Sequence, residues 1–225
     1  MGRKEIQMKR MWKYFVDATA QIIEEEGIEN VTIRKIADIA GYTSSTIYNY
    51  FEELSHLIFF ASMRFMNPYI KEFSYYMSKS ENSIEKYLLS WECFCKHSFN
   101  NPQIYHAIFN SDLGAKPEEL LSHYFEVYQN DLTGLSDEIK PLIFEYSLTK
   151  RSKFVLQKAV EEGYLDQDEI DEISNMTILI WRGMLTTFLN NRRDYKPEEA
   201  VEETMKYVRK ITMSALKKPI ELSKN

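Results

Sequence analysis

The chain contains few of the residues that form tight turns and covalent cross-links. Its 225 residues include only 7 glycines, 6 prolines and 2 cysteines. So little glycine and proline favours long helices joined by few turns. Cys93 and Cys95 are typical of a reducing compartment. Two positions apart on a helix, they would point in different directions and could not readily form a disulfide.

Long apolar runs are also absent. No segment approaches the roughly 18 apolar residues that a membrane-spanning helix requires. The first residues, MGRKEIQMKRMW, are basic but lack the apolar stretch of a secretory signal. We therefore expect a cytoplasmic protein that does not enter a membrane.

The common signatures of catalysis and cofactor binding are missing as well. There is no glycine-rich phosphate loop, no nucleophile elbow and no convincing catalytic triad. Cys93 and His97 have a helical spacing that can share a metal, but no third ligand is evident. Glu53 and His56 copy half of a di-iron motif, which needs a second copy and two further glutamates. We therefore expect no enzyme activity, no metal site and no cofactor.

The net charge gives no overall signature of nucleic-acid binding, because it is −6. Residues 1–50 hold seven basic and seven acidic side chains, so the negative charge belongs to residues 51–225. Five of those seven basic residues lie in the first thirteen positions, with Glu5 as the only acid. This asymmetry indicates a locally basic end attached to an acidic body.

Apolar residues recur at helical spacing along the chain, and no strand-like alternation interrupts them. The pattern predicts a helix that ends at Gly27, then a short helix capped by Thr32 and another capped by Thr43. A longer helix should follow, with a kink at Pro68. The predicted helices span residues 5–26, 33–40, 44–50, 53–78, 83–99, 102–111, 117–132, 137–162, 168–192 and 197–217. The sequence therefore predicts an all-α protein.

The segment IRKIADIAGYTSSTIYNYF reads as a helix, a glycine-centred turn and a second helix. Ile36, Ala37 and Ala40 form an apolar face on the first helix, and Ile47 and Phe51 form one on the second. The small alanines allow the two helices to approach closely. This geometry is typical of the helix-turn-helix, whose second helix enters the major groove of DNA.

The longer segment VTIRKIADIAGYTSSTIYNYFEELSHLI resembles the signature of the TetR family, and the likeness extends over about residues 8–60. The shared features are a threonine, Ile-Ala, Ala-Gly, a hydroxyl-rich turn, Thr-Ile-Tyr, an aromatic pair and Leu57. The resemblance implies a three-helix DNA-binding head at residues 1–52, with the helix-turn-helix at about 32–51. A long helix would join it to a larger helical body, residues 53–225, for effector binding and dimerisation.

The resemblance also assigns DNA-contacting roles to individual residues. Arg34 would reach a base edge, most plausibly guanine. Tyr42 replaces the usual small aliphatic residue and either adds a contact or packs. Tyr48 should place its ring against the core of the head and its hydroxyl outward. The other implied DNA-facing residues are Thr32 and Thr43 at the helix starts, Ser44, Ser45 and Thr46 toward the bases, and Asn49 and Tyr50 with Tyr48 toward phosphate.

One position departs from the family pattern. The family commonly has a phosphate-binding lysine at the start of the fourth helix, where this chain has Leu54 beside acidic residues. Either the register of that helix differs locally, or the basic N-terminal arm takes over the phosphate contacts. We favour the arm, and within it Lys9 and Arg10. The arm consists of Arg3, Lys4, Lys9, Arg10 and Lys13.

Apolar stripes and aromatic residues mark the body. The resemblance implies that the last two helices pair with those of a second copy, although such stripes can equally form an intramolecular core. The predicted dimer residues are Ile173, Met176, Ile180, Met184, Phe188, Met205, Val208 and Thr212. Most aromatics in residues 84–156 should be core, and a subset should line an effector pocket. The candidates for that pocket are Trp91, Phe94, Tyr128 and Tyr146.

Together these features predict a ligand-responsive, homodimeric transcriptional regulator. We expect a repressor that a small apolar or aromatic effector releases from a palindromic operator in double-stranded DNA. The alternative is an all-α small-molecule-binding protein or enzyme whose head no longer binds DNA. Leu54 and the acidic residues beside it favour that alternative.

Overall fold

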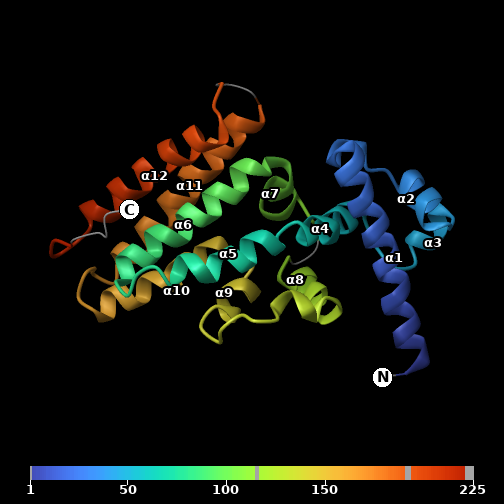
Figure 1. The fold of residues 1–225 in the computed structure, drawn as a ribbon, viewed down its shortest axis with the longest axis horizontal. Helices are drawn as coiled ribbons and strands as arrows, with labels where there is room; N and C mark the ends of the chain where they lie inside the picture. The colour runs from blue at the N-terminus through green and yellow to red at the C-terminus, as the bar shows by residue number, and fades with distance from the viewer. Residues whose placement is uncertain (1, 115–116, 191–193, 221–225) are drawn as a thin grey trace. The chain divides into compact units, whose positions relative to one another are not determined.

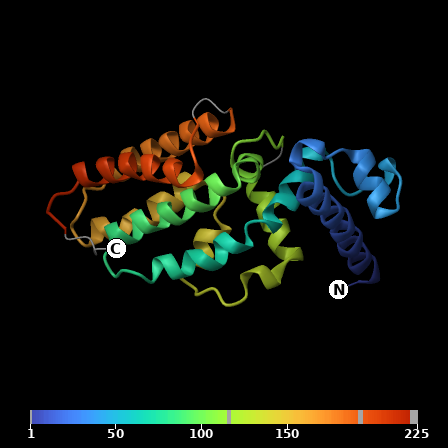
Figure 2. The same cartoon turned by 45° about the horizontal axis from the view of Figure 1, so that its top comes forward.

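The computed structural model describes residues 2–114, 117–190 and 194–220, and in these ranges helices are the only regular secondary structure (Figures 1 and 2). The predicted all-α fold is confirmed. None of the helices in these ranges is both long and apolar enough to cross a membrane. The chain packs into two compact units, which we call the first unit (residues 1–67 and 103–133) and the second unit (residues 68–102 and 134–225). The predicted functional boundary after residue 52 stays a prediction.

The first unit contains the helix-turn-helix and the helices that pack around it. Within this unit α1 packs against α2 and α4, and α8 packs against α4. The helices are α1 (Arg3–Glu26), α2 (Ile33–Ala40), α3 (Ser44–Ile47), α4 (Leu54–Arg64), α7 (Pro102–Phe109) and α8 (Pro117–Val127), with 3-10 turns at Ile28–Asn30 and Gln129–Leu132.

Local chemistry sets the ends of α2. The Thr32 hydroxyl accepts a hydrogen bond from the Lys35 amide at 3.3 Å, so it caps the helix as predicted. Gly41 ends α2 with φ of 74°, a left-handed conformation that a residue with a Cβ atom adopts at a cost. The Tyr42 amide then bonds back to the Ala37 carbonyl at 2.9 Å, which satisfies one of the last carbonyls of the helix.

Aromatic packing fixes the helix-turn-helix to α1. The Phe15 side chain is fully buried, and its ring centroid lies 5.6 Å from Tyr42, 5.7 Å from Tyr50 and 6.3 Å from Phe51. Trp12, nearly one turn earlier on α1, stacks on Phe51 at 5.6 Å. One face of α1 therefore contacts the turn before α3 and the segment after it.

The second unit is a bundle in which α6 packs against α10, α11 and α12 (Figures 1 and 2). Buried hydrogen bonds cross it. The Tyr87 hydroxyl donates to Thr177 Oγ1 at 3.0 Å, and Trp181 Nε1 donates to Ser98 Oγ at 3.0 Å. The helices are α5 (Asn67–Met77), α6 (Ser83–Asn100), α9 (Lys140–Phe144), α10 (Leu148–Glu161), α11 (Glu169–Leu189) and α12 (Pro197–Ser214).

The predicted kink near Pro68 is present as a break between α4 and α5 at residues 65 and 66. Proline has no N–H to donate to the carbonyl four residues earlier, and its ring crowds that carbonyl. The carbonyl concerned belongs to Arg64, the last residue of α4. The break therefore falls where proline chemistry places it.

The helix expected over 117–132 ends at Val127 and is followed by a 3-10 turn. Two further predicted helices are wrong in extent. The helix expected over 137–162 is two helices, because Glu145 is extended (ψ of 114°) and the Ser147 hydroxyl caps α10 at the Lys150 amide. The helix expected to reach Tyr50 ends at Ile47, and the next residues form a turn. Apolar spacing continues through both sites, so periodicity alone did not reveal either break.

The aromatic packing around Phe15 predicts a specific loss of stability. Phe15→Ala should reduce the free energy of unfolding by about 3–5 kcal/mol, because it removes a fully buried ring and leaves a cavity. Tyr14→Ala, at the neighbouring position where 59% of the side chain is exposed, should cost less than about 0.5 kcal/mol. Urea denaturation of both full-length variants, followed by circular dichroism, measures the difference. Equal losses would show that α1 does not anchor the head in this way.

Candidate nucleic-acid interface and effector cavity

The segment from α2 to the turn after α3 exposes a polar, largely uncharged surface. Arg34, Thr43, Ser45 and Asn49 are exposed, while Ser44, Thr46 and Tyr50 are half-buried; Thr32 is exposed at the start of α2. Ile36 and Ile47 are fully buried. The residues of this segment that were predicted to face DNA are thus all at least partly accessible.

Thr43 occupies the capping position of α3 but does not cap it through its side chain. Its Oγ1 atom lies 2.9 Å from Ser45 Oγ and 2.9 Å from Thr46 Oγ1, and it accepts no backbone N–H. The prediction of a Thr43 side-chain cap is therefore wrong. The Ser45 and Thr46 hydroxyls instead each bond to the Thr43 hydroxyl, which restricts their directions at the start of α3. Hydroxyls both donate and accept, so this cluster can meet phosphate oxygens or base edges.

The rings of Tyr42 and Tyr50 pack against the core of the head, and the ring of Tyr48 does not. Tyr48 is 56% exposed and makes no ring contact in the described part of the chain, so the prediction that its ring packs into the core is wrong. Tyr42 and Tyr50 pack on Phe15 instead. Tyr48 is the C-cap residue that follows buried Ile47, and its side chain leaves the core-facing side of α3.

Arg34 is the cation best placed for an external partner. The guanidinium is exposed and forms no ion pair with any described residue. At the next position, Lys35 Nζ lies 2.6 Å from Glu26 Oε2. On α1, Arg10 is exposed and Lys9 is half-buried, and neither pairs with a carboxylate in the described ranges. Arg34 and this part of the arm therefore retain charge for an anion.

Leu54 is the first residue of α4, so the helix starts within one residue of the predicted position. A shifted register thus finds no support as the reason for the missing lysine. The neighbouring Glu53 carboxylate accepts a hydrogen bond from the Ser55 hydroxyl at 2.9 Å. The start of α4 consequently presents a carboxylate next to the position where the family commonly has a cation.

Tyr128 was predicted to line the effector pocket and instead belongs to the first unit. The Arg64 guanidinium lies 4.8 Å from the Tyr128 ring centroid and pairs with Asp17 on α1. Lys13 Nζ lies 5.2 Å from the same ring. Burial raises the pKa of Tyr128 to about 12. The ring forms a cation–π cluster between α1 and α4, and its prediction as a pocket residue is wrong.

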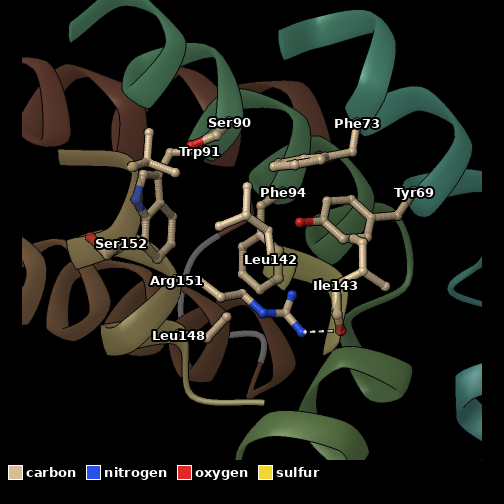
Figure 3. A pocket seen from close by; sticks show the side chains of 11 residues that line it. Tyr69, Phe73, Ser90, Trp91, Phe94, Leu142, Ile143, Leu148, Arg151 and Ser152 are labelled. Carbon is tan, nitrogen blue, oxygen red and sulfur yellow. Dashed lines mark hydrogen bonds between the residues drawn. The ribbon is translucent and has the colours of Figure 1, made fainter. Parts of the chain in front are cut away.

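Trp91 and Phe94 do line a cavity, which lies within the second unit (Figure 3). Tyr146 is not among the lining residues. The Arg151 guanidinium donates to the main-chain carbonyls of Glu145 and Ile143, the latter at 3.4 Å. The cavity volume is about 40 Å³. Its other lining residues are Tyr69, Phe73, Ser90, Leu142, Leu148, Ser152 and Val155.

A larger groove adjoins this cavity in the same unit. Its volume is about 710 Å³, and its lining includes Met77, Lys86, Phe154 and Lys158. Leu142 and Val155 line both the groove and the cavity. These two side chains therefore form part of the wall between them.

The predicted dimer residues separate into two groups. Ile173, Met205, Val208 and Thr212 are buried within the single chain, so the prediction that they contact a partner is wrong for them. Met176 is exposed, and Ile180, Met184 and Phe188 are half-buried. Sequence reasoning missed the most exposed member of this surface, Leu179, at 67% exposure. Helical spacing identified apolar residues on α11 and α12 without distinguishing their inner from their outer faces.

Comparisons with known proteins agree on the helix-turn-helix. Residues 15–54 match the model for bacterial regulatory proteins of the tetR family. An HTH-type transcriptional regulator of Staphylococcus aureus is 26% identical over 117 residues, which make up 49% of this chain and 63% of that relative. The match thus spans less than two thirds of the relative's length.

Solved structures extend the likeness to almost the whole chain. FadR of Thermus thermophilus, a TetR family repressor solved with lauroyl-CoA, has a TM-score of 0.60 at 13% identity, with 95% of this chain and 99% of that chain covered. RolR, solved with resorcinol, has a TM-score of 0.59 at 15% identity, with 94% and 97% covered. Likeness at such low identity shows the fold. Residues 15–54 thus match the helix-turn-helix of the tetR family of bacterial regulatory proteins, and the chain shares the fold of these solved structures.

Proposed function

We propose that this chain is a homodimeric transcriptional repressor that binds a palindromic operator and leaves it when a small aromatic effector binds. The observation that supports DNA binding most directly is the exposed polar surface around α3, on a helix-turn-helix that Phe15 anchors. That surface carries hydroxyl, amide and phenol groups beside the exposed Arg34. These groups contact phosphates and base edges in protein–DNA complexes.

In this proposal, different residues contact the DNA backbone and read the bases. The α3 hydroxyls position the head on the backbone, since serine and threonine discriminate bases poorly. Arg34 reads guanine, because its planar guanidinium can donate two parallel hydrogen bonds to the O6 and N7 atoms. Lys9 and Arg10 contact phosphate and replace the cation missing at Leu54.

The effector part of the proposal rests on the cavity in the second unit. Its walls are mainly aromatic and aliphatic, and Arg151 places a cation at its edge (Figure 3). At about 40 Å³ it is smaller than the roughly 300 Å³ at which ligand pockets begin, so a ligand must select a more open conformation. Effector and operator would then weaken each other by the same factor.

Selection of DNA sequences tests the proposed operator binding. Selection from random duplexes by the purified protein should recover a palindrome with half-sites about one helical turn, ~34 Å, apart. Arg34→Ala should cost about 1–3 kcal/mol and relax the preference at one position of each half-site. Lys9→Ala and Arg10→Ala should weaken all sequences alike and lower the salt dependence by about one phosphate each.

The matched control for these variants is Lys158→Ala, which removes an exposed cation from the second unit and should leave both specificity and salt slope unchanged. An unchanged slope in the Lys9 and Arg10 variants would rule out the arm as the phosphate contact. If no sequence is enriched even at low salt, the alternative of a small-molecule-binding protein or enzyme without DNA binding gains support. The Glu53 carboxylate at the start of α4 is the feature that favours that alternative.

Substitution of the exposed Leu179 tests the proposed dimer interface on α11. Leu179→Glu should weaken self-association at least about tenfold, because it places a charge at the most exposed apolar position of α11. Tyr75→Glu is the control, since Tyr75 is 61% exposed on α5 and not on this surface. Sedimentation equilibrium of both variants gives the dissociation constants. A dimer unaffected by Leu179→Glu would place the interface elsewhere.

Truncation of Leu142, which lines both the cavity and the groove, tests the proposed effector site. Leu142→Ala should join the cavity to the adjoining groove and raise affinity for a monocyclic aromatic probe such as resorcinol several-fold, as apolar cavities made by such truncations bind aromatic rings. Phe154→Ala changes the groove alone and serves as the control. Calorimetric titration with and without saturating operator also tests reciprocity. Equal probe affinity in the two titrations would exclude the release mechanism.

A further inference from the structure

Three chemically different side chains converge between α5 and α6 in the second unit. Glu72 lies on α5, and Cys93 and His97 lie one turn apart on α6. One ligand-type atom from each lies within 4.8 Å of the other two. The closest pair is His97 Nε2 and Glu72 Oε2, at 2.6 Å. The cluster thus brings a sulfur, an imidazole nitrogen and a carboxylate oxygen to one point.

We propose that Glu72, Cys93 and His97 bind a zinc-like divalent transition-metal ion that links α5 to α6. Sulfur and imidazole ligands select such borderline ions, whereas Mg²⁺ and Ca²⁺ require oxygen ligands throughout. Three protein ligands leave one position of a tetrahedral ion for water or another small ligand.

The dimensions of the cluster fit this ion. Bonds of about 2.0–2.3 Å to a tetrahedral zinc ion place the ligand atoms roughly 3.3–3.6 Å apart. The ligand atoms of the cluster now lie within 4.8 Å of one another, and the His97–Glu72 contact is shorter than the zinc spacing. Side-chain rotations that shift these atoms by about 1 Å therefore suffice, with no change of fold.

The surroundings supply access and orientation. Cys93 is buried, while 15% of the His97 side chain and 30% of the Glu72 side chain are exposed, so an ion can enter from solvent past the latter two. Lys96 Nζ holds Glu72 Oε1 at 2.6 Å, which leaves Oε2 for the ion and orients the carboxylate. The Tyr69 ring meets the His97 ring edge-to-face at 5.8 Å and limits its rotation.

Binding releases one proton. The Cys93 thiol gives its proton to solvent as the metal–thiolate bond forms. The hydrogen between His97 Nε2 and Glu72 Oε2 moves to His97 Nδ1, so that the neutral imidazole binds the ion through Nε2. The ion then carries the positive charge that balances the Cys93 thiolate and the Glu72 carboxylate. Because the ion binds the folded arrangement, it stabilises the second unit in proportion to its concentration.

The test uses the full-length chain without an affinity tag, freed of metal by a chelator and titrated with Co²⁺. One ion per chain should bind and give a thiolate-to-cobalt charge-transfer band together with the visible absorption of tetrahedral cobalt. Zn²⁺ should displace it, and Mg²⁺ should not. Zn²⁺ should also raise the midpoint of thermal unfolding.

Single substitutions identify which side chains bind the metal ion. Cys93→Ser should abolish the charge-transfer band, and Glu72→Gln and His97→Gln should each weaken binding by more than the roughly 10–100-fold that loss of an outer partner costs. Cys95→Ser is the matched control, because Cys95 is equally buried but lies outside the cluster, and it should bind as the unmodified chain does. If Cys93→Ser does not fold, the partly exposed His97→Gln carries the test. A charge-transfer band that survives Cys93→Ser, disappears in Cys95→Ser, or never forms would overturn the proposal.

Discussion

The burial of Phe15 against Tyr42, Tyr50 and Phe51 is the interaction on which the helix-turn-helix depends. Helices as short as α2 and α3 are not stable in water by themselves. Their stability must come from tertiary packing, and α1 provides it through one fully buried ring. Because the packing engages one side of the motif, the opposite side is free to be polar, uncharged and accessible.

That separation explains how a helix without charge can serve a polyanionic partner. Long-range attraction needs net positive charge but little geometry, so it can lie on the exposed basic residues of α1. Fit in a groove needs geometry but little charge, and in the proposed complex the hydrogen-bonded hydroxyls of Thr43, Ser45 and Thr46 would supply it. Arg34 combines both properties.

The sequence was informative wherever one residue decides a local structure, and less so wherever a contact depends on distant residues. The Thr32 cap and the break before Pro68 follow from the chemistry of a hydroxyl and of an imino acid, and both were predictable. Periodicity identified Val208 as apolar without showing that the chain itself buries it. Tyr128 and Trp91 were equivalent as aromatic candidates, yet the fold places them in different units. The short α9 and the cluster around Cys93 likewise depend on which helices meet.

Helix α5 contributes residues to both the aromatic cavity and the cluster of Glu72, Cys93 and His97. Its Tyr69 lines the aromatic cavity and also touches His97, while Glu72 on the same helix reaches the imidazole directly. An effector in the cavity and a metal ion at the cluster would therefore bias the same rings and the same helix. Two ligands that favour one conformation of a shared element strengthen each other, and two that favour opposite conformations compete. Whether effector and metal ion strengthen or oppose each other depends on whether the cavity opens by moving Tyr69 away from His97. An effector that displaces this ring would loosen the orientation of the imidazole and oppose the metal.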